Sequence, residues 1–311
     1  MKLIFAGTPD TAVPVAEAVG AAHEIQAVLT RPAAPVGRSS RLVPSPVEQW
    51  ARRQGIEVLA PDKVRDPAVA ARLGQLAPDC CVVVAYGGLI TRRLLEIPRH
   101  GWINLHFSLL PAYRGAAPVQ QAILDGCEQT GVTTFRLVEA LDAGPVFVQR
   151  AVTVGEDETA GDLLERLSQI GAGVMVETLE LADTGYCPVE QSEEGVSWAP
   201  KISPEQARLA VSAPAQAFVN RVRAMSPQPG AWMELDSQRF KILRAAVVRA
   251  ERDLGMVLDS PPGTLWATKK KLFYRAADAW VELVEVQATG KKPLAGADWA
   301  RGAWHQGASL G

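Results

Sequence analysis

The sequence predicts an α/β fold with an open, mostly parallel sheet, followed by a small β-barrel. In the first half of the chain, short apolar runs alternate with amphipathic stretches, which is the pattern of βαβ units. The run at residues 80–86 is almost entirely apolar, as in a strand that is buried on both faces. Beyond residue 232 the runs become short, strand-like and separated by turn residues, which is typical of a barrel.

Each element of the first part follows from a local pattern. The clearest helix start is Ser45, whose hydroxyl suits an N-cap, with Pro46 at the first helical position. The segment 32–46 contains four prolines and is too long and polar for a simple connection. Strands are expected at residues 2–6, 25–29, 57–59, 80–86, 102–107, 132–138 and 146–154, and helices at residues 11–21, 45–54, 66–76, 117–124 and 159–181.

The second part of the chain begins after a change in residue composition. Residues 183–199 are rich in Gly, Pro, Ser and Glu and indicate an exit from the first domain. A catalytic domain is therefore expected at residues 1–186, a linker at 187–207 and a C-terminal barrel domain at 208–311. Within these, a helix is expected at residues 204–211 and strands at residues 232–235, 240–245, 263–267, 271–274 and 280–286.

Composition places the chain among ordinary globular proteins, since 48% of its 311 residues are hydrophobic and 21% are charged. The longest purely apolar run, residues 82–85, is far below the ~20 residues of a membrane span. Residues 1–7 are too short for the core of a signal peptide, so we expect a cytoplasmic protein that does not enter a membrane. Cys80 and Cys81 are expected as buried packing residues, and no Cys/His spacing predicts a metal site.

The net charge of −2 hides an asymmetry along the chain. Residues 1–207 hold 17 Lys+Arg and 25 Asp+Glu, a net −8, whereas residues 208–311 hold 15 and 9, a net +6. A basic C-terminal third on an acidic body suggests an anionic partner for that third, although a solvated basic face without a partner is the alternative.

Two polar residues alternate with apolar ones in the expected strand at residues 102–107. Asn104 and His106 lie two positions apart and therefore share one face of the strand. Because burying an amide and an imidazole without partners is costly, we expect them near the open edge of the sheet, where ligands bind. A histidine bonded only to backbone in the core is the alternative.

Asp142 is the third candidate. It lies in a Leu-Asp-Ala-Gly-Pro turn at residues 141–145, and an aspartate in such a turn often only caps its own backbone. If the turn reaches His106, the carboxylate would pair with the imidazole and raise its pKa. An amide, an imidazole and a carboxylate form a set suited to acyl transfer, in which the amide and the imidazolium stabilise an oxyanion.

Several common motifs are absent from the sequence. Gly7 is followed by Thr-Pro-Asp, so there is no GxGxxG, and no GxxxxGK[ST] phosphate loop occurs either. Ser108 is not part of a nucleophile elbow. Nicotinamide-dependent, nucleotide-hydrolysing and serine-hydrolase functions are therefore disfavoured.

The motifs around these residues resemble the folate-dependent formyltransferase family, over essentially the whole chain. The first half contributes FAGTP at 5–9, NLHFSLLP at 104–111, YRGAAPVQQAI at 113–123 and LDAGP at 141–145. More discriminating are the GR and PSP of loop 32–46, APKI at 199–202, RAMSP at 223–227 and GKK at 290–292, which resemble the branch that formylates methionyl-tRNA.

The resemblance implies a Rossmann-like catalytic domain and an OB-like C-terminal barrel, 10-formyltetrahydrofolate as donor, initiator methionyl-tRNA as acceptor, no metal, and a monomer. The catalytic positions of the family match Asn104, His106 and Asp142. Its folate-contacting positions match Ser108, Leu109, Leu110 and Pro111, with Tyr86 and Gly87 at the pteridine site. The tRNA contacts are expected at Arg38, with Arg41 and Lys201 nearby.

Ser39 and Ser40 stand where the family often has glycine and lysine, so loop 32–46 carries less positive charge. Another formyl acceptor such as an amino sugar, or hydrolysis of the same folate, is the alternative among enzymes. A folate- or RNA-binding module without catalysis is the alternative from another class. The basic C-terminal part of the chain disfavours both an amino-sugar acceptor and folate hydrolysis. The presence of Asn104, His106 and Asp142 together disfavours a binding module without catalysis.

Overall fold

The computed structural model describes residues 1–35, 41–64, 66–249, 260–303 and 310. The chain divides into two compact units that interleave along the sequence. Unit 1 comprises residues 1–118, 129–152 and 164–198, and unit 2 comprises residues 119–128, 153–163 and 199–311. The expected linker at 187–207 thus contributes its first part to unit 1 and its last part to unit 2, and the exact domain boundaries stay a prediction.

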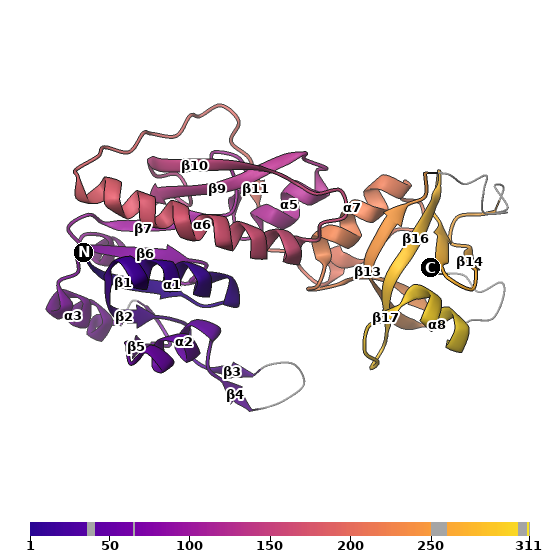
Figure 1. Cartoon of the computed structure of the whole chain (residues 1–311), viewed down its shortest axis with the longest axis horizontal. Coiled ribbons are helices and arrows are strands. Elements are labelled where there is room, and N and C mark those ends of the chain that lie inside the picture. Colours follow the sequence, from indigo (N-terminus) through magenta and orange to yellow (C-terminus); the bar gives the residue numbers. More distant parts are fainter. Residues whose placement is uncertain (36–40, 65, 250–259, 304–309, 311) are drawn as a thin grey trace. The chain divides into compact units, whose positions relative to one another are not determined.

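Unit 1 is built on a seven-stranded sheet in the order β10-β9-β7-β6-β1-β2-β5 (Figure 1). The pairs from β7 through β5 are parallel, and β9 joins β7 antiparallel. The predicted open, mostly parallel sheet is therefore confirmed. Its strands are β1 Lys2–Gly7, β2 Glu24–Leu29, β5 Glu57–Leu59, β6 Cys80–Val84, β7 Trp102–His106, β9 Gln129–Arg136 and β10 Val146–Thr153.

Helices connect or flank these strands, and two small ribbons complete the unit. The helices are η1 Asp10–Ala12, α1 Val13–Ala22, α2 Pro46–Gln54, α3 Pro67–Leu76, α4 Arg92–Leu95 and α6 Ala160–Asp183, whose first turn belongs to unit 2. The ribbons pair β3 Ala34–Pro35 with β4 Leu42–Val43, and β8 Arg114–Gly115 with β11 Trp198–Ala199.

The predicted local patterns hold in this unit. Ser45 caps α2, where its Oγ accepts a hydrogen bond from Glu48 N at 3.0 Å, and Pro46 opens the helix. Cys80 and Cys81 are fully buried in β6, as expected of small packing residues. The proline-rich loop differs from the prediction, because its two ends pair as the β3–β4 ribbon.

The strand register brings three strand ends to one edge of the sheet. Gly7 of β1 pairs with Val84 of β6, and Val84 pairs with Leu105 of β7. The chain leaving β6 at residue 85 and His106 at the end of β7 therefore lie at the same carboxyl edge, which is where open α/β sheets bind ligands.

Unit 2 contains an antiparallel sheet in the order β12-β13-β16-β15-β14, with β17 paired to β16. This agrees with the expected OB-like barrel. The elements are α5 Pro118–Leu124, η2 Glu205–Ala207, α7 Ala215–Met225, β12 Ala231–Leu235, β13 Gln238–Val247, β14 Leu265–Ala267, β15 Leu272–Arg275, β16 Trp280–Ala288, β17 Leu294–Ala295 and α8 Gly296–Ala303.

The helix expected at residues 204–211 is wrong. Only Glu205–Ala207 is helical there, as a single 3-10 turn. The backbone then becomes extended, because Arg208 bridges to Trp232 and Leu209 N donates to Trp232 O at 2.9 Å. Sheet pairing with β12 thus overrides local helix propensity. The actual helix, α7, lies in the following segment and buries Phe218, Val222 and Met225 in the core of unit 2.

Within the described residues, no helix combines the length and the apolar character that crossing a membrane requires.

Candidate active site

Strand β7 presents Asn104 and His106 to one cavity of unit 1, as the alternation of the strand predicts. The cavity holds about 500 Å³. Its walls come from the turn after β6, from β7, from the residues around Gly115 and from the segment 137–142, which includes Asp142. The three residues that the sequence marked as catalytic therefore meet in a single pocket.

His106 is held in one orientation by the backbone. Its side chain is buried, and Nε2 donates a hydrogen bond to the carbonyl oxygen of Tyr113 at 2.9 Å. The other ring nitrogen, Nδ1, lies 3.9 Å from Oδ2 of Asp142. This separation is too long for a hydrogen bond and short enough for a strong charge interaction.

Burial lowers the pKa of His106, whereas the charge of Asp142 and the hydrogen bond to Tyr113 raise it. The net direction is down, so the ring is neutral near pH 7 with its proton on Nε2 and its lone pair on Nδ1. The raising effect of Asp142, expected from the sequence, is present, but desolvation of the buried ring outweighs it.

Asn104 lies in the middle of β7, between Val83 of β6 and Phe135 of β9. Its side chain is half-buried in the cavity wall. Among the described residues none forms a hydrogen bond with its side-chain amide. An amide that faces a cavity without a protein partner is available to donate to a bound oxygen.

Asp142 reaches the site by a loop that runs back along β7. Leu137 N donates to Trp102 O at the start of β7, and five residues later Asp142 lies beside His106 at its end. Asp142 has φ +49°, in the left-handed region that non-glycine residues avoid. Its Oδ2 accepts a hydrogen bond from Gly115 N at 2.8 Å. The carboxylate thus contacts Gly115 and faces His106 in the cavity, and it does not cap its own turn.

Tyr86 and Gly87, expected at the pteridine site, also line the cavity. Ala85 and Gly87 both have positive φ, which turns the chain sharply as it leaves β6. The turn is tied down by Thr8, whose Oγ1 donates to Tyr86 O at 2.9 Å. These backbone groups sit at the carboxyl edge because β6 ends there.

The segment expected to contact folate, Ser108 to Pro111, does not line this cavity. Ser108 is fully buried and its Oγ donates to Ala112 O at 2.7 Å. Leu110 N donates to Thr133 Oγ1 at 3.1 Å, and Leu110 O accepts from Gln149 Nε2 at 2.6 Å. The segment fixes the course of the chain from His106 to Tyr113, and its folate contacts stay a prediction.

Of the expected tRNA-contacting residues, Arg41 and Lys201 are not among the residues that line the cavity. Arg38 lies outside the described residues. Arg41 is exposed and directly precedes β4. Lys201 is exposed in unit 2.

Two groups that hold His106 and Asp142 in place were not found from the sequence. The carbonyl of Tyr113 and the N–H of Gly115 are backbone groups, to which residue type gives no signal. Both belong to the YRG stretch at 113–115, so that stretch was the available clue.

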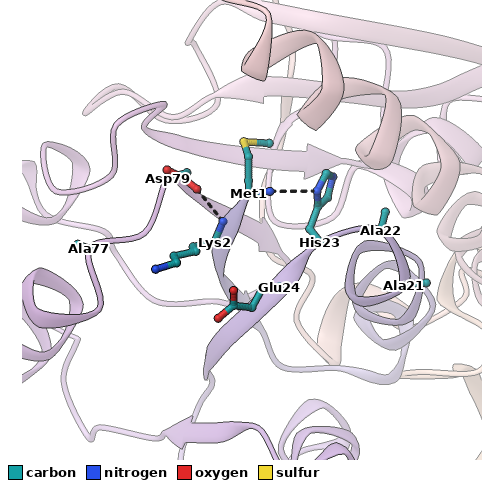
Figure 2. A pocket seen from close by; sticks show the side chains of 8 residues that line it. All are labelled: Met1, Lys2, Ala21, Ala22, His23, Glu24, Ala77 and Asp79. Atoms are coloured by element: carbon teal, nitrogen blue, oxygen red, sulfur yellow. Dashed lines mark hydrogen bonds between the residues drawn. The ribbon is translucent and has the colours of Figure 1, made fainter.

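A second hollow of unit 1 lies at the opposite edge of the sheet, at the amino ends of β1 and β2 (Figure 2). Asp79 and the N-terminal ammonium, two charged groups of this hollow, have neighbouring partners. Lys2 N donates to Asp79 Oδ2 at 2.7 Å, and the N-terminal ammonium lies 3.5 Å from Nδ1 of His23. Burial and the nearby ammonium lower the pKa of His23. The hollow lies at the opposite ends of the strands from His106 and shares no lining residue with the cavity at β7.

Family models match both parts of the chain. Residues 1–179 match the model described as formyl transferase, and residues 201–303 match the model of the formyl transferase C-terminal domain. The chain belongs to the formyl transferase family. The cavity described above lies wholly within the first of these two matches.

Relatives within the formyl transferase family extend over both parts of the chain. The methionyl-tRNA formyltransferase of Cutibacterium acnes is 49% identical over 306 residues and covers 97% of each chain. That of Thermobifida fusca is 50% identical over 305 residues, covering 97% of this chain and 96% of the relative.

Solved structures of the family share the fold. A sugar 3N-formyl transferase, crystallised with dTdp and 5-N-formyl-THF, aligns with a TM-score of 0.66 at 15% identity, covering 94% of this chain and 99% of that one. The methionyl-tRNA formyltransferase from Clostridium thermocellum aligns with a TM-score of 0.58 at 16% identity, covering 81% and 95%. At these identities the likeness concerns the fold alone.

Proposed function

We propose that this enzyme transfers the formyl group of 10-formyltetrahydrofolate to the α-amino group of initiator methionyl-tRNA. The observation that carries the proposal is the convergence of Asn104, His106 and Asp142 on one cavity, in a chain about half identical to methionyl-tRNA formyltransferases along its whole length. The product, N-formylmethionyl-tRNA, serves translation initiation, which places the enzyme in the cytoplasm, where it acts as a monomer.

The residues that line the cavity support a partly apolar, ring-containing donor. Its walls include exposed or half-exposed apolar side chains at the mouth, among them Leu89, Val138 and Leu141, and backbone turns at Gly87 and Gly88. Pockets that combine apolar walls with a few polar groups are typical of sites for ring-containing ligands. The pteridine ring would lie against these walls with its formyl group toward β7.

The reaction requires an oxyanion donor and a carrier for one proton. The amine nitrogen attacks the formyl carbon, the carbon–N10 bond breaks, and one amine proton ends on N10. Asn104 donates to the oxygen that becomes negative as the tetrahedral intermediate forms, because its amide faces the cavity without a protein partner. Collapse of the intermediate releases tetrahydrofolate.

His106 carries the proton at Nδ1, since Nε2 is held by Tyr113. The neutral ring accepts the amine proton and returns it to N10, and Asp142 at 3.9 Å stabilises the imidazolium in between. A protonated His106, as expected from the sequence, would also share in binding the oxyanion. The lowered pKa favours the carrier role, because the resting ring has no proton on Nδ1 to donate.

The tRNA contacts proposed at Arg38, Arg41 and Lys201 rest on the family resemblance and on the basic C-terminal third. Phosphate contacts are their default role. An amino-sugar acceptor is the second candidate, since a sugar N-formyl transferase shares the fold.

One assay separates these functions. The enzyme is incubated with 10-formyltetrahydrofolate and one of three acceptors: charged initiator tRNA, a nucleotide-linked amino sugar, or water alone. We expect the formyl group to appear on the methionine of the tRNA, with tetrahydrofolate formed in equal amount. Formylated sugar, or free formate at the same rate without tRNA, would replace the proposed acceptor by another.

A further inference from the structure

Gln191 links the turn that contains Asp142 to strand β8. Its Nε2 donates to Asp142 O at 2.9 Å and to Gly144 O at 2.8 Å. Its Oε1 accepts from Arg114 of β8, from Nη2 at 2.6 Å and from Nε at 3.2 Å. The amide thus uses both of its N–H groups and both of its acceptor positions in one bridge.

The turn that Gln191 contacts needs external support. A non-glycine residue at φ +49° costs on the order of 1–3 kcal/mol of backbone strain, so Asp142 keeps this conformation only if its surroundings impose it. His106 does not impose it, because 3.9 Å is beyond hydrogen-bond distance. Within the described residues the carboxylate accepts one hydrogen bond, from Gly115 N, and that group belongs to the same ribbon strand as Arg114.

Gln191 is itself fixed from both sides. On one side, Val189 and Val146 exchange reciprocal backbone hydrogen bonds of 2.7 and 2.8 Å. On the other side, Ser197 O accepts from Arg114 N at 2.9 Å, and Ser197 Oγ accepts from Tyr113 N at 2.9 Å. The segment 189–198 is therefore packed onto unit 1 in a defined register, and it presents the Gln191 amide to the turn.

We propose that Gln191 is a positioning residue for the formyl transfer: it fixes the Asp142–Gly144 turn against β8, so that the Asp142 carboxylate faces Nδ1 of His106. This role rests on the proposed function. Gln191 does not line the cavity and acts only through Asp142. A residue in an apparently linker-like stretch is thereby part of the catalytic framework.

The test compares isosteric and neighbouring variants in the full-length enzyme. Gln191→Glu keeps the volume and the acceptors for Arg114, but it has no N–H for the two carbonyls and repels them. We expect kcat for methionyl-tRNA formylation to fall roughly 10- to 100-fold, with the KM for folate changed less than about threefold, because a misplaced carboxylate affects the transition state more than binding. Ser192→Ala is the matched control, since exposed Ser192 only accepts a hydrogen bond from Glu194 N.

A double-variant cycle separates positioning from a merely structural effect. If Gln191 acts through Asp142, then Gln191→Glu combined with Asp142→Asn is as slow as Asp142→Asn alone. Multiplicative losses in the double variant, or a kcat of Gln191→Glu within twofold of the wild type, would overturn the inference. Wild-type enzyme in the same assay keeps the two proposals distinct, since only its failure to formylate methionyl-tRNA counts against the proposed function.

Discussion

At the residue scale, Asn104 is the member of the proposed catalytic set whose polar group faces the cavity without a hydrogen-bond partner among the described residues. We expect Asn104→Ala to lower the single-turnover rate by about 10²–10³, the usual cost of losing one oxyanion donor. Asn104→Asp keeps the volume without the donor and should lose as much. Melting temperatures of both variants should match the wild type, and a rate within tenfold of wild type in either variant would assign the oxyanion to another group.

The ionisation of His106 gives a prediction with a definite sign. Because burial lowers its pKa, we expect the ring of the ligand-free enzyme to titrate below the ordinary value of 6.5. Asp142 raises the pKa by its charge, so Asp142→Asn should move the titration to still lower pH. The measurement is an NMR titration of the His106 ring carbons in labelled protein. A midpoint above 6.5 would mean that burial does not dominate the pKa of His106, and an upward shift in Asp142→Asn would mean that Asp142 does not stabilise the imidazolium.

The same residues show what the sequence could and could not reveal. Successive side chains of a strand point to opposite faces, so the sequence alone placed Asn104 and His106 on the same face of β7. The lowered pKa of His106 was not visible, since it depends on how deeply the strand end is covered. Gln191 was missed for a related reason: its contact with Asp142 spans 49 residues, and its own neighbourhood of Gly, Ser and Glu looks like a linker.

At the scale of elements, the strands of the unit 1 sheet were predictable from their apolar runs. Segments whose backbone can pair with a distant strand were harder to predict. Strands such as β6 are buried on both faces, and their apolar runs have no other explanation. The helix expected at residues 204–211 failed because its backbone pairs with β12 instead. Helix α7 contains both polar and apolar residues, and its apolar side chains pack in the core of unit 2.

Helix α6 offers a matched pair of glycines, two residues apart. Gly173 is exposed and a Cβ there meets nothing within 4 Å, so Gly173→Ala should stabilise unit 1 by about 0.5–1 kcal/mol through helix propensity. At Gly171 a Cβ would lie 2.5 Å from Cδ2 of Leu105, which is buried in β7. Gly171→Ala should therefore destabilise by roughly 1–3 kcal/mol, the usual cost of overpacking.

Urea unfolding of the two α6 variants measures both effects. Since Leu105 lies between Asn104 and His106, Gly171→Ala should also slow catalysis, whereas Gly173→Ala should not. Equal stability changes in the two variants would show that α6 is not pressed against β7.

At the scale of the whole chain, the two units interleave, and Arg223 explains how distant segments enter unit 2. Its guanidinium is buried and donates to Gly155 O at 2.5 Å and to Glu158 O at 2.9 Å. Both carbonyls precede α6, in the segment 153–163, which continues into the first turn of that helix and belongs to unit 2 by its contacts. The RAMSP stretch at 223–227, first noted as a family resemblance, thus has a structural role.

Arg244 makes the matching comparison, because it also bonds this segment, through both carboxylate oxygens of Asp162 at 2.8 Å, but at a half-exposed site. Arg223→Met should cost about 3 kcal/mol, since it leaves two carbonyls without their charged donor. Arg244→Met should cost under about 1 kcal/mol, as exposed ion pairs do. Chemical unfolding of the full chain measures both values. We expect the two losses of unfolding free energy to differ by about 2 kcal/mol or more, which would show that buried hydrogen bonds from Arg223 hold the segment 153–163 in unit 2. Similar losses in Arg223→Met and Arg244→Met would mean that surface charge holds this segment.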